Sequence, residues 1–577
     1  MNPNEIIKLK TGHRRMRGAL AIFLAVLMIY GLRLVQLQAL DAPQLAAAAA
    51  EKRTRTLILP AQRGEITDRK GAPLAITVDA RNITVDQTMV QDPAGTANAI
   101  AQITGADATL LQADLTGDKK FKYVLKKITP EQWTAINQLK LPGIFSEKTS
   151  TRIYPSNSLA ASTIGFVGGE DRGMAGLEFG FEKELAGSSG EVTVEISAAG
   201  RSLPSGVASQ VTPQPGIGIR LTIDRDLQFV AEQALAQKVE YAQADSGTLV
   251  AISPKTGKIL ALVTYPTFDS NNPQDAIATT INNHALVDAY EPGSTAKVIT
   301  MAGLLNEGVA NPATKFTVPP VIKRNGKTFH DHDPHGVLQL TLTGILAKSS
   351  NIGTIQASEL MGAEKFNEYL LKFGVGQETG MHFPGESNGR LASLEKWSGT
   401  SFPTFAFGQG YMVSAVQIAS MYATIANDGV RVNPSLIEGY VLPDGKFQAA
   451  TESLKTEVIR PEVAQTLREM METVVSDEGT APLAAIPGYR VAGKTGTSQV
   501  VDQNCKCYGN IVIASFIGMA PAEDPEIVVA VALHNPKNGR WGGLLAGPVF
   551  KEVAQYALQQ GNIPPSTGKP MGYPVKW

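Results

Sequence analysis

The sequence predicts an α/β, multi-domain protein, and three observations support this fold class. The chain has 577 residues, enough for two or more hydrophobic cores. From about Ile219 onward the chain alternates strand-like apolar runs with longer stretches of helical character. The strand-like runs predict a hairpin and an antiparallel meander. These elements are 246–253 and 258–265 for the hairpin, 489–500, 511–518 and 527–533 for the meander, and 338–353 and 416–427 for two helical segments.

A basic N-terminus followed by an apolar run predicts a membrane anchor. Lysines and arginines precede Gly18, and residues 18–32 carry no charge. This run is near the short end for crossing a bilayer, which needs roughly 20 residues, but the apolar residues after Arg33 extend it. Positive charge before the run predicts a cytoplasmic N-terminus and an exported remainder. A cleaved signal peptide is the alternative, because the small residues near Ala39 and Ala42 also fit a cleavage site.

Composition shifts divide the chain into five segments. Short strand-like runs and turns rich in glycine and proline predict an elongated, mixed N-terminal module, and Pro213-Gln214-Pro215-Gly216 precedes one large α/β unit. The end of the chain is again rich in proline and glycine, which predicts a flexible tail. The predicted segments are a cytoplasmic basic tail (1–17), a transmembrane anchor (18–38), the N-terminal module (39–212), a catalytic domain (213–562) and the flexible tail (563–577).

Three short motifs in order indicate an acylatable serine with proton-handling partners. Ser294 and Lys297 follow the turn signal Pro292-Gly293, and three residues are almost one helical turn, so the amine can reach the hydroxyl. An ordinary lysine, with a pKa of about 10.4, is a poor base at neutral pH, but burial near other cations lowers that pKa. The later motifs are Ser349-Ser350-Asn351 and Lys494-Thr495-Gly496-Thr497, the last on a predicted edge strand whose glycines allow close approach of a ligand.

Each motif also has a decoy copy, so order and context must decide. Ser393-x-x-Lys396 lies in a polar stretch without apolar periodicity, and Lys255-Thr256-Gly257 is better explained as a hairpin turn. Ser270-Asn271-Asn272 also matches the second motif. Ser294 alone could simply cap a helix, as serine often does. That simpler explanation does not account for the ordered set, because agreement across several levels outweighs any single match.

With these motifs in place, the chain resembles a class B penicillin-binding protein and is most similar to the FtsI-like septal transpeptidases. The resemblance extends from about Arg63 to Phe550. It implies a penicillin-binding, serine-transferase-like catalytic domain, in which an antiparallel sheet has helices on both faces and a helical subdomain beside it. It also implies that the N-terminal module is a class B-type dimerisation or pedestal module. The further stretches that carry the resemblance are Arg63-Gly64-Glu65-Ile66-Thr67-Asp68-Arg69-Lys70-Gly71, Arg152-Ile153-Tyr154-Pro155, Gly176-Leu177-Glu178, Phe383-Pro384-Gly385-Glu386, Phe407-Gly408-Gln409-Gly410 and Gly547-Pro548-Val549-Phe550.

The resemblance implies a peptidoglycan D,D-transpeptidase that crosslinks stem peptides during septal cell-wall synthesis. Ser294 would attack the penultimate D-alanine of a stem pentapeptide, with Lys297 as the base. Ser349 would relay a proton to the leaving group. Asn351 would hold Lys297 or the substrate amide, and Lys494 would supply positive charge.

Substrate contacts and partners follow from the same resemblance. Thr495, Gly496 and Thr497 would bind the substrate, and the backbone N–H groups of Ser294 and Thr497 would form the oxyanion hole. β-Lactams would acylate Ser294. The implied partners are the membrane, an FtsW-type glycosyltransferase and other divisome proteins, and the mechanism needs no cofactor or metal.

Several alternatives stay open at this stage. A β-lactam sensor or hydrolase on the same fold, an elongation-type transpeptidase and a non-catalytic scaffold remain possible functions. The 52 lysines and arginines nearly balance the 53 aspartates and glutamates. The chain therefore has no large positive net charge that would favour binding to nucleic acid. The histidine-rich segment 330–335 has metal-binding chemistry but is more typical of a polar loop. Cys505 and Cys507 could form a tight disulfide in an exported protein or stay two thiols.

Overall fold

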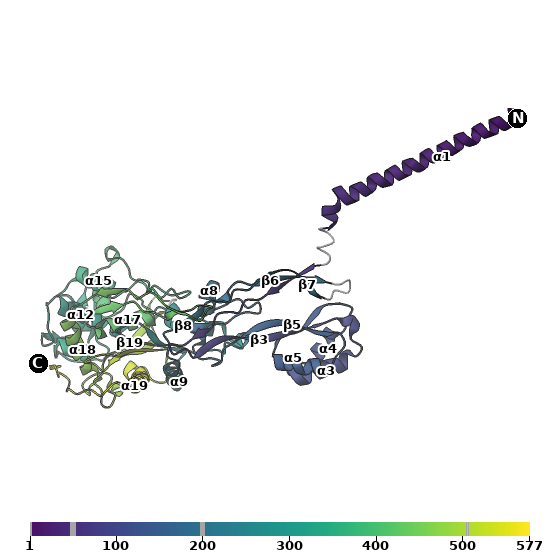
Figure 1. Ribbon diagram of the computed structural model, residues 1–577. Helices are drawn as coiled ribbons and strands as arrows, with labels where there is room; N and C mark the ends of the chain where they lie inside the picture. Colours follow the sequence, from purple (N-terminus) through teal and green to yellow (C-terminus); the bar gives the residue numbers. More distant parts are fainter. Residues whose placement is uncertain (1–2, 47–53, 197–201, 503–504, 506) are drawn as a thin grey trace. The chain divides into compact units, whose positions relative to one another are not determined.

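The computed structural model describes residues 3–46, 54–196, 202–502, 505 and 507–577. Within these residues the chain divides into two compact units. The first comprises Met1–Ala61 and Ser188–Gln214, and the second comprises Gln62–Gly187 and Pro215–Trp577. Figure 1 labels the main elements of both units, and the second unit contains the residues predicted to form the site.

The first unit contains a long apolar helix and a small antiparallel sheet. Helix α1 (Pro3–Val35) continues into a π-helical turn, η1 (Gln36–Leu40). Among the described residues one helix, His13–Leu40, is long and apolar enough to cross a membrane. Its 28 residues exceed the roughly 20 that a bilayer requires, so it fits a single-pass anchor. The sheet has the order β1-β6-β7, formed by β1 (Thr54–Leu59), β6 (Gly190–Ile196) and β7 (Ser202–Val211).

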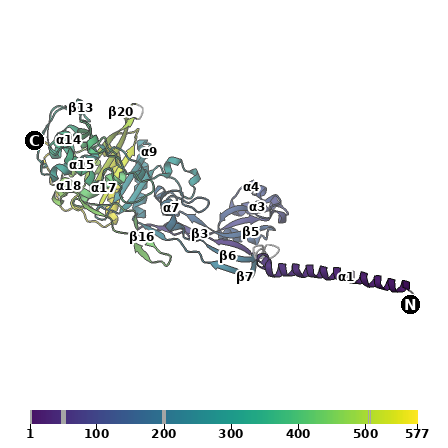
Figure 2. The same cartoon turned by 90° about the horizontal axis from the view of Figure 1, so that it is seen from above.

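The N-terminal part of the second unit is built on one long strand. Strand β3 (Pro73–Val85) pairs with β2 (Ile66–Thr67), β4 (Lys122–Ile128) and β5 (Ile144–Ile153). Helices α3 (Pro93–Thr104) and α4 (Ala108–Leu115) lie beside β5 (Figure 2), and α5 (Pro130–Gln138) contacts β3. Each of these helices starts at a residue whose side chain accepts from a free backbone N–H: Asp92, Asp107 and Thr129. A separate core joins these elements, and it includes Ile83, Val85, Ile100, Leu111 and Leu115.

A buried ion cluster lies where three stretches that carry the family resemblance meet. The Glu178 carboxylate, on the short helix α7 (Gly176–Gly180), is fully buried. It accepts from Arg63 Nε at 2.6 Å and from Arg152 Nε at 2.8 Å. We call these three residues the Glu178 cluster. A buried carboxylate with two guanidinium partners has its charge compensated, so this cluster ties separate segments together.

Strand β8 (Gly218–Leu221) joins the N-terminal part of the second unit to its larger part. It pairs in parallel with β2 and antiparallel with β16 (Ile437–Val441). The resulting sheet has the order β17-β16-β8-β2-β3-β4, with β17 at Phe447–Ala449.

The larger part of the second unit is organised around an antiparallel sheet with the order β10-β9-β21-β20-β19. The predicted hairpin is confirmed, because β9 (Ser246–Ile252) pairs with β10 (Ile259–Tyr265). The predicted meander is confirmed as β19 (Ala492–Asp502), β20 (Cys507–Ala520) and β21 (Ile527–His534). β19 lies at the end of the sheet, as the glycine-rich pattern indicated.

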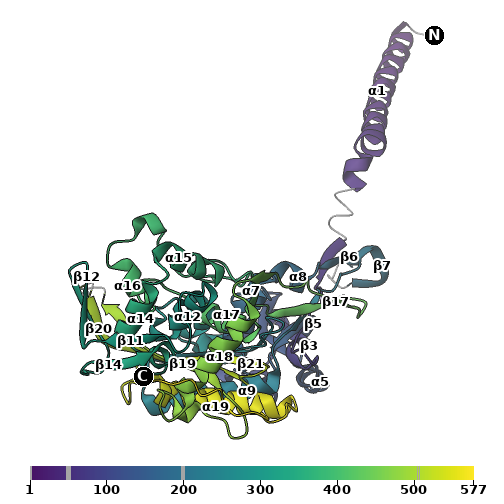
Figure 3. The ribbon, with the colours of Figure 1, turned by 90° about the vertical axis from the view of Figure 1, so that its left-hand side faces the viewer.

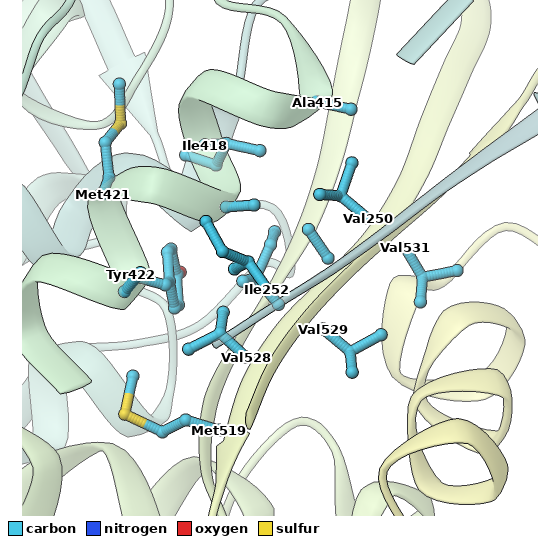
Figure 4. Close-up of a cluster of buried hydrophobic side chains, with 14 of the residues drawn as sticks. Val250, Ile252, Ala415, Ile418, Met421, Tyr422, Met519, Val528, Val529 and Val531 are labelled. Atoms are coloured by element: carbon cyan, nitrogen blue, oxygen red, sulfur yellow. The ribbon is translucent and has the colours of Figure 1, made fainter. Parts of the chain in front are cut away.

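Helices cover both faces of this sheet, as the fold class required. Figure 3 shows α17 (Ala415–Ala426) on one side and α9 (Arg225–Ala242) with α19 (Gly542–Gln560) on the other. In Figure 4, Val528 points toward α17, whereas Val529 and Val531 point to the opposite side. This alternation follows from the two-residue period of a strand, and each fully buried aliphatic side chain contributes about 1.5–3 kcal/mol.

Smaller helices and strands complete the part of the unit beside the sheet. Its helical segments are α10 (Ala278–Ile281), α11 (His284–Val287), η4 (Gly293–Ala296), α12 (Lys297–Asn306), α13 (Leu342–Ala347), α14 (Asn351–Ser358), α15 (Ala363–Lys372), η5 (Leu394–Lys396), α16 (Ser401–Ala406) and α18 (Pro461–Val475). Its short strands are β11 (Lys315–Val318), β12 (Val321–Arg324), β13 (Lys327–His330), β14 (Leu338–Thr341), β15 (Val430–Val432) and β18 (Lys455–Glu457).

The predicted helical segment 338–353 is wrong at its start and in its middle. The first four residues form β14, and α13 begins only at Leu342, because the Thr341 hydroxyl accepts from the backbone N–H of Gly344 as a helix cap. The helix then ends before Ser349, whose φ of +59° lies in the left-handed region. Helix α14 starts anew behind its own cap, Ser350.

The end of the predicted flexible tail lies against β14. Lys576 bridges to Leu340 in antiparallel register, and the Val575 carbonyl accepts from the backbone N–H of Thr341 at 3.1 Å. A Cβ atom at Gly344 would collide with the Val575 carbonyl oxygen, so the tail needs a glycine on α13. The last residues of the chain are therefore bonded to the strand that leads into α13.

Candidate active site

A cavity of about 880 Å³ gathers residues from all three motifs. Ser294, Ser349, Asn351, Thr495 and Thr497 line it. These residues come from η4, from the turn before α14 and the first residue of α14, and from β19, which are far apart in the sequence. The fold therefore brings the ordered motifs to one place, as their common function requires.

The turn that carries Ser294 is fixed against β19. Ser294 lies in the 3-10 helix η4, and Lys297 is the first residue of α12. Gly293 has a φ of +55°, and a Cβ there would collide with the Ser498 hydroxyl of β19. Its N–H donates to the Gly408 carbonyl at 2.8 Å. A side chain at position 293 would therefore push the nucleophile's turn away from the strand.

Glu291, just before this turn, adds two further attachments. Its carboxylate accepts from the Tyr508 hydroxyl and from the backbone N–H of Gly410, both at 3.0 Å. Burial raises the pKa of Glu291, although these two bonds oppose that shift. The bonds join the Ser294 turn to β20 and to the stretch that contains Gly408.

Two buried lysines meet at Ser349. Lys297 Nζ donates to the Ser349 carbonyl oxygen at 2.5 Å and lies 3.4 Å from the Ser349 hydroxyl oxygen. Lys494 Nζ donates to the same hydroxyl at 2.9 Å. Both lysines are fully buried. We call Lys297, Lys494 and Ser349 the lysine cluster.

Burial lowers the pKa of both lysines. It lowers the pKa of Lys297 to about 7, against an opposing effect from the Asp331 carboxylate. Burial, together with the positive charge of Lys297, lowers the pKa of Lys494 well below its ordinary value. A substantial fraction of Lys297 is therefore a neutral amine at pH 7, which is the form that can accept a proton.

Strand β19 presents the third motif at the open edge of the sheet. The Thr495 hydroxyl bonds to that of Thr480 at 2.7 Å. A Cβ at Gly496 would lie 2.9 Å from the Thr295 side chain, so only glycine allows β19 to approach η4 this closely. Thr497 follows at the cavity wall. An extended peptide can pair with such an unpaired strand edge.

Asn351 lines the cavity as the first residue of α14. Its side-chain nitrogen donates to the His330 carbonyl at 3.4 Å. Its expected contact with Lys297 or with a substrate amide stays a prediction.

The contribution of Asp331 was not predicted, because the histidine-rich segment that contains it indicated only metal-binding chemistry. The Asp331 carboxylate instead accepts from Ser350 and Ile352, on either side of Asn351. A sequence signal was present, because the start of a helix leaves several backbone N–H groups that need acceptors, and a loop with two aspartates precedes this helix. In the part of the chain that the structure describes, no group of three histidine, cysteine, aspartate or glutamate residues could hold a metal ion.

The two cysteines form a disulfide. Cys507 begins β20, opposite Asp502 at the end of β19. The pairing that the sequence left open is therefore present beside the two strands that border the cavity.

Two family descriptions match this chain. "Penicillin binding protein transpeptidase domain" matches residues 247–555, more than half of the chain, and "Penicillin-binding Protein dimerisation domain" matches residues 58–221. Together with the serine and lysine site, these matches define a class of cell-wall enzyme. The chain belongs to the class B penicillin-binding proteins, as its sequence motifs predicted.

Individual relatives agree with this assignment over nearly the whole chain. Penicillin-binding protein PbpB of Mycolicibacterium smegmatis is 36% identical, covering 97% of this chain and 92% of the relative. Peptidoglycan D,D-transpeptidase FtsI of Escherichia coli is 31% identical, covering 94% and 91%. The crystal structure of penicillin-binding protein 3 of Mycobacterium tuberculosis, complexed with aztreonam, is similar with a TM-score of 0.71 and 30% identity. That match covers 90% of this chain and all of the other.

Proposed function

We propose that this protein is a membrane-anchored peptidoglycan D,D-transpeptidase that works through an acyl-enzyme at Ser294. The observation that carries the proposal is a cavity lined by Ser294 and by Ser349, where Ser349 bonds to two fully buried lysines. The names of the relatives PbpB and FtsI support a role in septal wall synthesis.

Acylation uses Ser294 and Lys297. The neutral amine of Lys297 accepts the hydroxyl proton while Ser294 Oγ bonds to the carbonyl carbon of the penultimate D-alanine. The backbone N–H groups of Ser294 and Thr497 donate hydrogen bonds to the resulting oxyanion. Removing one such donor typically slows the reaction about 100- to 1,000-fold. The tetrahedral intermediate then expels terminal D-alanine. Its nitrogen takes a proton relayed through Ser349, which lies between the two lysines.

Substrate binding uses the edge of β19. Lys494 contributes positive charge, and the hydroxyls of Thr495 and Thr497 donate to the terminal carboxylate of the stem peptide. Asn351 binds the substrate amide. An amine of a second stem peptide then attacks the ester carbonyl, loses a proton to Lys297, and releases Ser294 with the crosslink formed. β-Lactams enter the same pathway, because their strained amide imitates the scissile bond.

A labelled penicillin tests the proposal directly. Benzylpenicillin should add to Ser294, as mapped by mass spectrometry of peptides, and Ser294→Ala should abolish the adduct. Ser393→Ala is the matched control, because Ser393-x-x-Lys396 repeats the motif outside the cavity lining. An adduct on another serine would overturn the proposal.

The lifetime of the acyl-enzyme separates this function from a β-lactam hydrolase or sensor. A transpeptidase should hold the penicilloyl group for many minutes, whereas a hydrolase needs a base for the deacylating water and turns over rapidly. Release of D-alanine from a stem pentapeptide, with formation of a crosslink, further distinguishes an enzyme from a scaffold.

The remaining expectations concern topology and partners. We place the N-terminus in the cytoplasm and the catalytic domain outside the membrane, because basic residues precede the uncharged apolar run 18–32. The segment boundaries 1–17, 18–38, 39–212, 213–562 and 563–577 belong to the same proposal. An FtsW-type glycosyltransferase and other divisome proteins are the proposed partners. An N-terminal fluorescent fusion should locate at the septum, and a lateral-wall pattern would indicate an elongation role.

A further inference from the structure

Asp331 makes three hydrogen-bonded contacts beside the site. It follows β13 in the histidine-rich loop, and its side chain is 8% exposed. One carboxylate oxygen accepts from the Ser350 hydroxyl at 2.6 Å and lies 3.0 Å from His335 Nε2. The other accepts from the backbone N–H of Ile352 at 2.9 Å. The carboxylate therefore holds the chain on both sides of Asn351.

The segment held in this way includes a strained residue. Ser349 directly precedes Ser350 and has a left-handed φ of +59°, a conformation that is unfavourable for a residue with a side chain. Such a conformation persists only where surrounding contacts impose it. In this conformation the Ser349 carbonyl faces Lys297 Nζ and its hydroxyl faces Lys494 Nζ. The Asp331 contacts anchor the residues that immediately follow it.

Asp331 is also the negative charge that acts on Lys297. The Lys297 amine donates to the Ser349 carbonyl and shares the Ser349 hydroxyl with Lys494. Burial lowers the pKa of Lys297, and the negative charge of Asp331 opposes that shift. His335 Nε2 lies 3.0 Å from the same Asp331 oxygen that accepts from Ser350, so it partly screens this charge.

We propose that Asp331 is a positioning residue, which holds Ser349 between the two lysines and sets the charge state of Lys297, with His335 moderating its field. This inference rests on the proposed function, since it assigns Asp331 a part in acylation of Ser294. Asp331 acts through Ser349 and Lys297 and does not itself touch the substrate.

Two variants make the proposal testable through opposite shifts in pH dependence. Asp331→Asn removes the negative charge, so the Lys297 pKa falls further and the acidic limb of the acylation profile moves to lower pH. Its plateau rate should fall roughly 10- to 100-fold because Ser349 is less well placed. His335→Phe removes a donor and leaves the Asp331 charge less shielded, so the acidic limb should move to higher pH.

A buried helix cap elsewhere in the same unit provides the control. Asp224 accepts from the backbone N–H groups of Asp226 and Leu227 at the start of α9, and it is also buried. Asp224→Asn should lower the thermal unfolding midpoint without moving the pH profile. Asparagine can still accept a cap bond but loses the ion pair with Lys70, so this variant separates the loss of a buried capping charge elsewhere in the unit from the loss of a charge beside Lys297.

The measurement is the rate constant of acylation by labelled benzylpenicillin between pH 5 and pH 9, together with the final labelling stoichiometry and thermal unfolding. Opposite shifts in the two variants, with full labelling at Ser294, support the proposal. An acidic limb at the wild-type position in both variants overturns it. If Asp331→Asn does not fold, an unmoved or downward-shifted profile in His335→Phe overturns the proposal. Label on a serine other than Ser294 in the unaltered protein would instead refute the proposed function.

Discussion

The second unit contains two buried clusters of charge, and they are built in opposite ways. In the Glu178 cluster one carboxylate contacts two guanidinium groups. Burial lowers the pKa of Arg63, but the charges of Glu178 and Glu182 outweigh that effect and raise it. In the lysine cluster two cationic side chains share a serine, and both lysine pKa values are lowered.

The comparison shows that a buried charge with a counter-charge stabilises the fold, whereas two buried like charges activate a side chain for proton transfer. A compensated charge keeps its ordinary ionised form and links segments of the fold. Two amines buried together cannot both stay charged without a large cost, so at least one gives up its proton readily. The free-energy cost of burying two lysines together arises at the site where Ser294 needs a base. The two clusters should therefore respond differently to mutation and to pH.

The largest expected effect is on the rate of acylation in Lys297→Met. Methionine fills a similar volume without the amine, so acylation by benzylpenicillin should fall roughly 100- to 10,000-fold, the usual contribution of a general base. The thermal unfolding midpoint should not fall, because the variant removes a buried amine. Stopped-flow acylation and calorimetry measure the two quantities.

Lys396→Met is the matched control for this prediction. Lys396 occupies the decoy motif on η5 and is exposed, so its loss should change neither quantity. A rate for Lys297→Met within threefold of the unaltered protein would contradict the assignment of Lys297 as the base.

The next effect is on stability in Glu178→Gln. Removing the carboxylate takes away the counter-charge of the buried Arg152 and leaves Arg63 with Glu182, and breaking a buried ion pair in this way typically costs about 3–5 kcal/mol. The free energy of unfolding should fall by this amount in denaturant titration, while the acylation rate per folded molecule stays the same. Glu182→Gln should cost about 1 kcal/mol or less, because that side chain is 30% exposed. Equal losses in the two variants would contradict the distinct role of Glu178.

The smallest expected effect is the change in acylation rate with pH in the unaltered enzyme. Burial lowers the pKa of Lys297 to about 7, and only the neutral amine accepts the serine proton. The acylation rate should therefore fall about tenfold for each pH unit below this pKa and level off above it. In Lys297→Met the residual rate should not follow this curve. A flat profile in the unaltered protein would show that another group is the base.

Local patterns predicted much of this structure. The hairpin of β9 and β10, the meander that begins at β19 and helix α17 follow from short-range periodicity and turn residues. The three motifs identified the residues that meet at the cavity. These features depend on neighbours in the sequence or on recurring combinations of residues.

Other features depend on contacts between residues that are far apart in the sequence, and local periodicity does not predict such contacts. The break at Ser349 in the predicted helical segment depends on Asp331 and on the two lysines. The pairing of Lys576 with Leu340 joins residues more than two hundred positions apart. Local composition also predicted a flexible tail without showing which strand its last residues would meet.

The pairing of Val575 and Lys576 with β14 makes a distant segment part of the support for the helix that leads to Ser349. Strand β14 pairs with β11 and is also bridged by Lys576. The Val575 carbonyl accepts from the backbone N–H of Thr341, the residue whose hydroxyl caps that helix. A proteolytic cut just before Val575 would therefore loosen the start of this helix, although the cut lies 234 positions from Thr341 in the sequence.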